Sequence, residues 1–373
     1  MRARCIAPLL MIMYHLVSRL FPTRTLTALR PRRVVLILPC CIGDVMLATA
    51  TLKALRRGYP DAHITWAVGS WSRPAVEGHD LLDAVLDTGE AALPVHTPGD
   101  LVNFARLLRE GDYDLAVSLV RSPLMSLAVW LAGIPWRAGL DSGGRGFGYN
   151  IRAAIDPQQP RHEAEIYLDV ARALGLNVRD CYANVPVRQA DRDALRARGL
   201  GNAPYLVIAP AGGRNPGMVM DSKRWPPERF AALADRLAAH LGIERVVLLG
   251  GAGDEALVQA VESALRVPSI AYVGQLSFGQ MAALAQMARV YVGNDTGLTH
   301  LAAAAGAKTV MILGPSDPAR YAPFAPNARA LWKPAALPAG GVAHGQPVGW
   351  DWARDGLSVD EVEAGALAFL AQV

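Results

Sequence analysis

The chain has 373 residues, of which 52% are hydrophobic and 19% are charged, so it is no disordered protein and can form two domains that each bury a core. The formal net charge is +4, but residues 1–33 hold seven arginines and no acidic residue, so the rest of the chain carries 4 − 7 = −3. Because residues 34–373 carry a slightly negative net charge, the composition excludes a nucleic-acid-binding function.

Residues 6–20 are mainly apolar and lie within this arginine-rich arm, residues 1–32. The apolar run is interrupted by Pro8, His15 and Arg19, and a membrane span needs about 20 consecutive apolar residues. No small-residue cleavage site of a secretory signal follows it. Two interpretations stay open: a helix that contacts an anionic membrane surface through residues 6–33, or an extension packed on its own domain.

From residue 34 onward, short β-branched segments alternate with amphipathic ones. In the first half we predict strands at residues 34–38, 64–68 and 115–119 and helices at 44–57, 100–109, 123–132 and 163–174. In the second half we predict strands at 205–209, 245–249, 269–273, 290–293 and 309–313 and helices at 227–241, 254–265, 278–287 and 296–305. A polar stretch at 188–203 separates the halves, and a last helix at 358–370 follows a loop at 332–352 to which we assign no structure.

This alternation predicts the α/β class, with parallel sheets and right-handed crossovers. We expect two doubly wound domains, residues 33–190 and 204–330, that face one another across a cleft, with residues 331–373 as a tail. Ligands of such folds bind at the carboxyl ends of the strands. The candidate residues below all follow predicted strands.

The first candidate is the loop Gly293-Asn-Asp295-Thr296-Gly297, which joins a strand to a helix. The free amides at the start of that helix form an anion site, and Gly297 lets a ligand approach the backbone. Thr296 and His300 are four residues apart and share one helix face. The alternative is a helix capped by Asp295 with a satisfied histidine. For the whole loop we favour an anion-binding site.

The second candidate is the glycine-rich turn at residues 210–217, with Gly212 and Gly213, followed by Lys223-Arg-Trp-Pro. The turn exposes backbone amides, and Lys223 and Arg224 bring positive charge to the start of the next helix. A diphosphate would explain both features.

The third candidate is the segment at residues 251–256, which matches G-x-G-x-x-A between a strand and a helix. The acidic residue that a dinucleotide site needs about 20 residues later is missing. Glu255 could bind ribose hydroxyls instead, and the alternative is a helix-start carboxylate without a ligand.

The fourth candidate is Asp44 in Cys40-Cys41-Ile-Gly-Asp, where a strand turns into a helix. Asp44 is either a general base that faces a nucleotide held by the other half or the N-cap of its helix. The two Asp-x-Asp strings lie before a strand and in the polar stretch, and no His/Cys/Asp group shows metal-ligand spacing in the sequence. We predict no metal and no cofactor. Neighbouring cysteines without Cys-x-x-Cys spacing favour a reducing compartment.

Together these motifs resemble glycosyltransferase family 9, the ADP-heptose:lipopolysaccharide heptosyltransferases, over residues 33–326. The resemblance rests on I-G-D at 42–44, K-R-W-P at 223–226, D-T-G-L-T-H-L-A-A-A-A-G at 295–306 and G-P-S-D-P at 314–318. N-P-G-M at 215–218 and the segment at 162–176 also resemble the family. The paired cysteines, the basic arm and the long tail are departures from its pattern.

The resemblance implies a GT-B fold and a metal-independent, inverting transfer of heptose to a sugar of the lipopolysaccharide core. The partners would be a nucleotide-sugar donor and a lipid-linked saccharide acceptor, in the cytoplasm or at the cytoplasmic face of the inner membrane. It also assigns roles: Asp44 as the base, Lys223 at the leaving diphosphate and Glu255 on the ribose. Asp295 would contact the donor sugar, with Thr296, Gly297 and His300 at the phosphates.

Three other functions stay open. A transferase of the same kind could use another nucleotide sugar. An NAD-dependent oxidoreductase could use residues 250–256. A non-catalytic nucleotide-sugar binder would not need Asp44.

Overall fold

The structure is a computed structural model that describes residues 29–91, 93–156, 159–215, 218–335 and 349–372, together with residues 13, 14, 16, 17, 19–21 and 23. Most of the arginine-rich arm and of the loop at 332–352 lies outside the described residues, so the expected membrane contact through residues 6–33 stays a prediction. Contacts divide the chain into two compact units, Met1–Cys181 and Tyr182–Val373. Each unit is described by itself.

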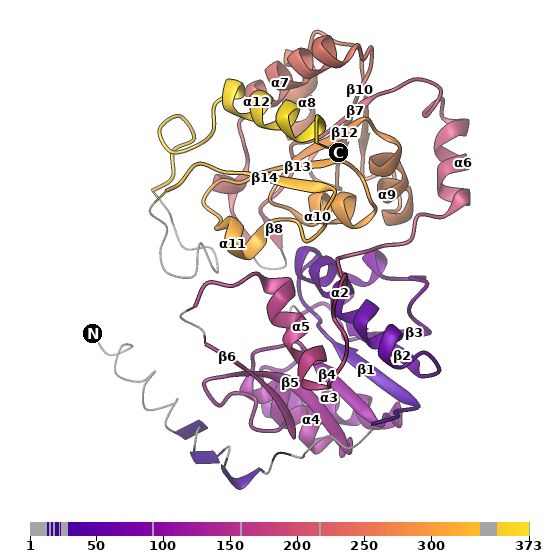
Figure 1. Cartoon of the computed structure of the whole chain (residues 1–373), viewed down its shortest axis with the longest axis vertical. Coiled ribbons are helices and arrows are strands. Elements are labelled where there is room, and N and C mark those ends of the chain that lie inside the picture. The colour runs from indigo at the N-terminus through magenta and orange to yellow at the C-terminus, as the bar shows by residue number, and fades with distance from the viewer. Residues whose placement is uncertain are drawn as a thin grey trace. The chain divides into compact units, whose positions relative to one another are not determined.

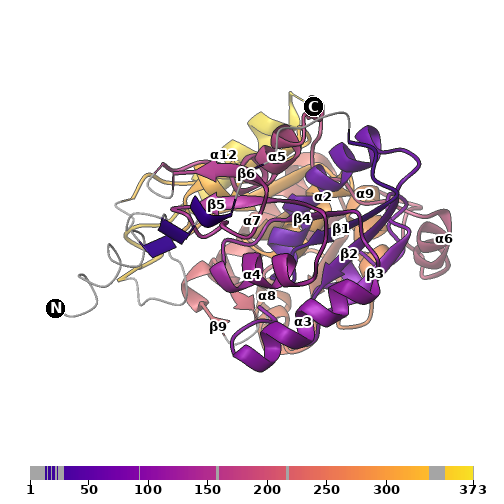
Figure 2. The ribbon, with the colours of Figure 1, turned by 90° about the horizontal axis from the view of Figure 1, so that it is seen from below.

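The N-terminal unit contains a parallel sheet with the strand order β3-β2-β1-β4-β5-β6 (Figure 1). Its strands are β1 (Arg33–Ile37), β2 (His63–Val68), β3 (Ala84–Asp87), β4 (Leu115–Ser118), β5 (Trp136–Ser142) and β6 (Ile151–Ile155). Its helices are α2 (Ile42–Gly58), the short η1 (Arg73–Ala75), α3 (Pro98–Glu110), α4 (Pro123–Leu131) and α5 (Glu163–Ala173). Helices α2 and α5 pack together on one face of the sheet, and α3 and α4 pack on the other (Figure 2).

The sequence predicted the buried strands and the helices of this unit, but not β3, β5 and β6. Strands β1 and β4 are buried along almost their whole length, which gives the continuous apolar pattern of a central parallel strand. Strand β3 is only half-buried, and β5 includes Arg137, whose guanidinium donates hydrogen bonds to the carbonyls of Ile134 and Gly148. Such strands lack the apolar pattern from which a strand is predicted.

The C-terminal unit repeats this topology, with the parallel order β11-β10-β7-β12-β13-β14. Its strands are β7 (Leu206–Ala209), β10 (Val246–Gly250), β11 (Ser269–Val273), β12 (Val290–Asn294), β13 (Thr309–Ile312) and β14 (Ala328–Leu331), with the small hairpin β8 (Arg214–Asn215) and β9 (Met218–Val219). Its helices are α6 (Gln189–Ala197), η2 (Asp221–Lys223), α7 (Pro227–Leu241), α8 (Glu255–Ala264), α9 (Phe278–Met287), α10 (Gly297–Ala304), α11 (Pro318–Tyr321) and α12 (Val359–Leu370). The expected pair of doubly wound domains is confirmed.

The polar stretch at 188–203, for which the sequence predicted no helix or strand, contains a helix. It forms α6, which packs on α9 and buries Leu195 and, just beyond the helix, Leu200. The chain already joins the C-terminal unit before α6, because the amides of Ala183 and Val185 donate to carbonyls of that unit. The last helix, α12, packs on α7 and buries Val362 and Phe369 in the core. The described part of the tail therefore belongs to the C-terminal unit.

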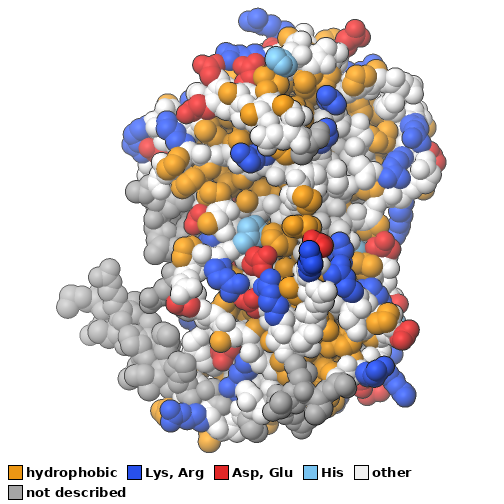
Figure 3. All heavy atoms as spheres, in the orientation of Figure 1, with side chains coloured by type: hydrophobic (Ala, Val, Ile, Leu, Met, Phe, Trp, Pro, Cys, Tyr) orange, Lys and Arg blue, Asp and Glu red, His pale blue; other side chains and the backbone are white. Residues whose placement is uncertain are grey.

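In both sheets the direction of winding reverses between the first strand and the fourth, that is, between β1 and β4 and between β7 and β12. The carboxyl ends of these strand pairs are where ligands of doubly wound folds bind. Positive and negative side chains are interspersed over the face seen in Figure 3, in agreement with the small net charge of residues 34–373. Among the described residues, no helix is long and apolar enough to cross a membrane.

Candidate functional site

Asp44 lies in the first turn of α2, at the switch point of the N-terminal unit, that is, where the direction of winding reverses between β1 and β4. The N-cap of this helix is Cys41, and its backbone carbonyl accepts a hydrogen bond from Val45. Asp44 is therefore not the N-cap, and that interpretation of the sequence is wrong. Its carboxylate lies at the positive end of the helix dipole, near the carboxyl ends of β1 and β4.

Tyr167 and Glu163 of α5, and Arg121 after β4, form a polar group near this carboxylate. The hydroxyl of Tyr167 donates a hydrogen bond to Asp44 Oδ1 at 3.0 Å. Burial, followed by the charge of Asp44, holds the pKa of Tyr167 well above its usual range, so the tyrosine stays a neutral donor. Arg121, three residues after β4, pairs with the buried Glu163.

Burial alone would lower the pKa of Arg121, but the charge of Glu163, its hydrogen bond to Arg121 and the charge of Asp44 outweigh that effect and raise the pKa. Arg121 Nε is buried and lacks a hydrogen-bond partner among the described residues. The sequence prediction missed these three residues. The available signal was that Arg121 follows a buried strand at the switch point.

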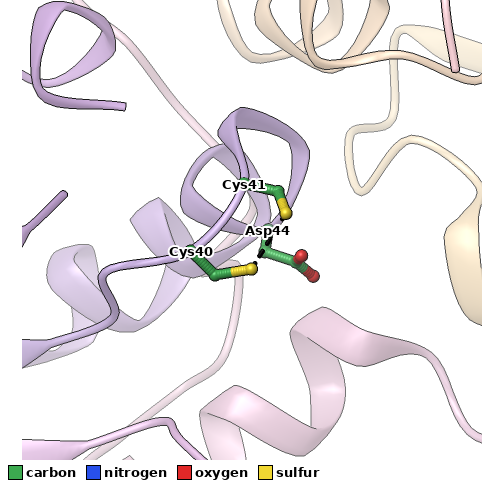
Figure 4. Close-up of side chains that lie close together, drawn as sticks. All are labelled: Cys40, Cys41 and Asp44. Atoms are coloured by element: carbon green, nitrogen blue, oxygen red, sulfur yellow. Dashed lines mark hydrogen bonds between the residues drawn. The ribbon is translucent and has the colours of Figure 1, made fainter. Parts of the chain in front are cut away.

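The two cysteines before α2 lie beside Asp44. Their sulfur atoms are 2.9 Å apart, and one ligand atom from each of Cys40, Cys41 and Asp44 lies within 4.8 Å of the others (Figure 4). The hydrogen bond with Cys40, then burial and the charges of Cys40 and Asp44, raise the pKa of Cys41 well above its usual range. The sequence showed no group with metal-ligand spacing, but the start of α2 places two thiols and a carboxylate together, and the prediction of no metal stays a prediction.

In the C-terminal unit, Lys223 and Asp295 form the centre of a buried polar network. Lys223 Nζ lies 2.6 Å from Asp295 Oδ2, and the hydroxyl of Ser316 donates to the same oxygen at 2.6 Å. His300 Nε2 lies 3.8 Å from Asp295 Oδ1, and its Nδ1 is buried without a hydrogen-bond partner among the described residues. The described residues therefore satisfy only one of the two ring nitrogens of His300.

Asp295 remains ionised in this network. Burial alone would raise its pKa, but the charge of Lys223 and the nearby His300 outweigh burial and hold the pKa well below its usual range. Lys223 also lies 5.6 Å from the centre of the Tyr321 ring. The structure thus connects the two motifs that the sequence placed 72 residues apart.

Asn294 fixes the loops around this network. Its side-chain amide donates to the carbonyl of Pro210 at 2.7 Å and accepts from the amide of Trp225 at 3.0 Å. The loop after β7, the start of α7 and the loop after β12 are therefore held together by one buried side chain. Asn294 lies within the Gly293–Gly297 motif, but the sequence pattern did not predict this role.

The two candidate glycines allow the β7 loop to pass close to its neighbours. Gly213 has a φ of 69°, and a Cβ atom there would lie 2.1 Å from the carbonyl oxygen of Met220. A Cβ atom on Gly212 would lie 3.3 Å from the Cβ of Asn294 and 3.6 Å from that of Thr296. The loops after β7 and β12 thus lie against one another.

Helix α10 begins at Gly297, and its N-cap is Thr296 rather than Asp295. The Thr296 side chain makes no capping hydrogen bond, which leaves its hydroxyl available to a ligand. Asp295 is therefore not the helix cap, and that alternative is wrong.

Glu255 lies at the exposed first position of α8, and its Oε1 accepts a hydrogen bond from the amide of Gly253 at 3.1 Å. Backbone hydrogen bonds lower its pKa. Arg214 lies over this loop, since a Cβ atom on Gly253 would come within 2.5 Å of its guanidinium. The role of Glu255 on the ribose stays a prediction.

The structure thus gathers Lys223, Asp295, Thr296 and His300, with Gly212 and Gly213 beside them, at one switch point. Glu255 lies at the end of the neighbouring strand β10, and Asp44 belongs to the other unit. The residues missed in this network are Asn294 and Ser316. Ser316 belongs to the G-P-S-D-P motif. The motif supported the family resemblance, but it did not predict the hydrogen bond from Ser316 to Asp295.

Comparison with known proteins agrees with this arrangement. Residues 101–339 match the family model "Glycosyltransferase family 9 (heptosyltransferase)". Lipopolysaccharide heptosyltransferase 2 of Escherichia coli K12 is 27% identical over 314 residues, which cover 80% of this chain and 87% of the relative.

Solved structures support the fold. A glycosyltransferase family 9 protein from Veillonella parvula superposes with a TM-score of 0.74 at 22% identity, covering 93% of this chain and 99% of that one. The ADP-heptose lipopolysaccharide heptosyltransferase II of E. coli gives a TM-score of 0.71 at 23% identity, covering 91% and 99%. These similarities agree with the GT-B fold of two Rossmann-like domains.

Proposed function

Because the chain belongs to glycosyltransferase family 9, we propose that this glycosyltransferase moves heptose from ADP-heptose to a sugar of the lipopolysaccharide core. The observation that carries the proposal is the buried Lys223–Asp295 pair at the start of α10, beside free helix amides and a glycine-rich turn. The relative from E. coli is named a lipopolysaccharide heptosyltransferase, which supports heptose and this acceptor. Membership of the family also sets aside the oxidoreductase interpretation of residues 250–256.

The donor half of the reaction belongs to the C-terminal unit. The amides at the start of α10, the hydroxyl of Thr296 and the ammonium of Lys223 can bind a diphosphate and stabilise it as the leaving group. Asp295 orients Lys223 and lies beside His300, and a direct contact of Asp295 with the donor sugar stays a prediction. Gly212 and Gly213 keep side chains away from the phosphates, and Glu255 would bind the ribose hydroxyls.

The acceptor half belongs to the N-terminal unit, with Asp44 as the general base. Tyr167 orients the carboxylate through Oδ1, so a fixed carboxylate can take the proton from an acceptor hydroxyl. We propose a single displacement with inversion at the anomeric carbon, which needs one base and a stabilised leaving group. Helix amides and Lys223 supply the charge stabilisation, and no metal is part of this proposal.

We further propose that the acceptor is lipid-linked and that the reaction takes place at the cytoplasmic face of the inner membrane. The apolar, arginine-rich residues 6–33 would provide contact with that surface.

A screen of nucleotide sugars tests the donor. The purified enzyme is given lipopolysaccharide whose core lacks the heptose that this enzyme is proposed to add. It should release ADP from ADP-heptose and form a product whose anomeric configuration is opposite to that of the donor. Turnover with a UDP- or GDP-sugar, but none with ADP-heptose, would contradict the heptose assignment. A retained anomeric configuration would contradict the single displacement.

Lys223→Met gives the matched test of the leaving-group role. The substitution keeps an unbranched side chain, one atom shorter, but removes the positive charge, so kcat should fall by about 100-fold or more. Lys308→Met, on the loop before β13, is the control and should retain turnover. Equal turnover of the wild type and Lys223→Met would remove Lys223 from the mechanism.

A further inference from the structure

The loop between β1 and α2 places two thiols and a carboxylate side by side. The sulfur atoms of Cys40 and Cys41 and a carboxylate oxygen of Asp44 lie within 4.8 Å of one another, and the three side chains point to the same side of the helix start (Figure 4). All three residues are partly exposed, so an ion from solution can reach them. We propose that Cys40, Cys41 and Asp44 form a binding site for a thiophilic divalent cation, of which Zn²⁺ is the best match.

The donor set selects the metal. Two sulfur ligands exclude Mg²⁺ and Ca²⁺, which prefer oxygen, and favour Zn²⁺ or Co²⁺. In a tetrahedral zinc site with Zn–S bonds of about 2.3 Å, the two sulfurs are about 3.8 Å apart. The sulfurs are 2.9 Å apart, so the two side chains must rotate apart to reach this spacing. The three protein ligands leave a fourth position for water or a substrate oxygen.

The surrounding structure holds the ligands in place. The Tyr167 hydroxyl donates to Asp44 Oδ1 at 3.0 Å, as outer partners of metal-binding carboxylates do. The Ser72 hydroxyl donates to the carbonyl of Cys40 at 2.5 Å and fixes the loop. Arg121 is the nearby positive charge, and its ion pair with Glu163 offsets its repulsion of a cation.

A disulfide between the two cysteines fits the geometry less well. The peptide bond that joins them is trans, which sets their Cα atoms about 3.8 Å apart. Disulfides usually join Cα atoms that are about 4.4–6.8 Å apart. Metal binding requires no such span: each thiol loses one proton, both sulfurs coordinate the ion, and no electron is transferred.

If Asp44 is the base proposed above, an ion in this site inhibits transfer, because the carboxylate that must accept the acceptor proton becomes a metal ligand. This consequence rests on the proposed function. Binding itself does not, and the two can be measured separately.

Cobalt provides the binding measurement. The reduced full-length protein, titrated with Co²⁺, should develop thiolate-to-cobalt charge-transfer and visible ligand-field bands at one ion per chain, and Zn²⁺ should abolish them. The Cys40→Ser/Cys41→Ser double variant should lose the bands, and each single serine variant should weaken binding at least about tenfold. Asp44→Asn should keep the charge-transfer bands with weaker affinity. Cys181→Ser, which removes a buried thiol elsewhere in the same unit, should bind as the wild type does.

Two results would overturn the proposal: wild-type protein without cobalt–thiolate bands, or bands that persist in the double variant. A wild-type mass lower by two hydrogens after purification with reductant, together with no titratable thiol at residues 40 and 41, would show a disulfide instead. Zn²⁺ should also inhibit turnover reversibly, with chelator restoring it, and the single serine variants should resist inhibition relative to their own metal-free activity. Cobalt–thiolate bands in a protein without any transferase activity would support the metal site and contradict the proposed function.

Discussion

Asp44 is the residue on which the acceptor half of the proposed chemistry depends. Asp44→Asn keeps the shape of the side chain but removes its ability to accept a proton, so kcat should fall by about 10²–10⁴-fold. The affinity for ADP-heptose should change little, because the donor residues belong to the other unit. Steady-state kinetics and calorimetric titration of the donor measure the two effects. Asp61→Asn, an exposed residue of the same unit, is the control and should retain turnover.

Tyr167→Phe refines this test, because it removes only the hydrogen bond to Asp44 Oδ1. A loss much smaller than that of Asp44→Asn identifies Tyr167 as a positioning residue. Full turnover in Asp44→Asn would show that another group is the base.

The contribution of Asp295 to the free energy of unfolding should depend on pH. Its pKa is held well below the usual range in the folded protein, so its contribution to stability is fully present above the unfolded pKa of about 3.9 and is lost as the pH falls toward the folded value. Asp295→Asn leaves Lys223 buried without its counter-charge and should cost about 3 kcal/mol at pH 7. The difference in unfolding free energy between wild type and variant should narrow only below about pH 4, as measured by urea unfolding across pH.

The exposed ion pair between Asp360 and Arg236 provides the control for this experiment. Asp360→Asn should cost less than about 1 kcal/mol, because exposed pairs contribute little. An Asp295→Asn variant as stable as this control would contradict the buried network.

At the scale of the element, the turn after β7 gives a test of backbone geometry. Gly213→Ala should destabilise the turn and weaken donor binding, because its Cβ would lie 2.1 Å from the Met220 carbonyl oxygen at a φ of 69°. Gly242→Ala has a similar φ of 63°, but nothing lies within 4 Å of its Cβ, so only the cost of positive φ applies, about 1 kcal/mol. Thermal unfolding and donor titration of both variants separate the clash from the strain. Equal effects would show that the turn tolerates a side chain.

The elements also show what the sequence could and could not predict. Helix α7 was predicted with its observed bounds because a proline starts it and Gly242 ends it with a left-handed residue. The edge strands β3, β6 and β14 were missed because they are only partly buried, so their pattern resembles that of a loop. Helix α6 was missed because its apolar anchors are too few to form a visible stripe among its charged residues.

The candidate site divides in the same way. Residues within a motif, such as Lys223 and Asp295, were found because their backbone context is local. The partner of Asp295, Ser316, was not found, and neither were Tyr167 and Arg121 near Asp44, because each reaches its place only through tertiary packing within its own unit. The pairing of Lys223 with Asp295 likewise depends on two loops that meet at the β7/β12 switch point.

At the scale of the whole molecule, each unit has its own sheet and core. We therefore expect residues 182–373, expressed alone, to fold and to bind ADP within a few-fold of the affinity of the full chain, as measured by calorimetry. The separate N-terminal unit should bind no ADP. Binding of ADP by the N-terminal unit would contradict the assignment of the donor residues.

Heptose transfer to the lipopolysaccharide core can be tested by mass spectrometry of that core from a strain that lacks this chain. We expect a core that lacks one heptose and the sugars beyond it, restored by the wild-type chain but not by Asp44→Asn. A core of unchanged mass, a core that lacks a different sugar, or restoration by Asp44→Asn would contradict it.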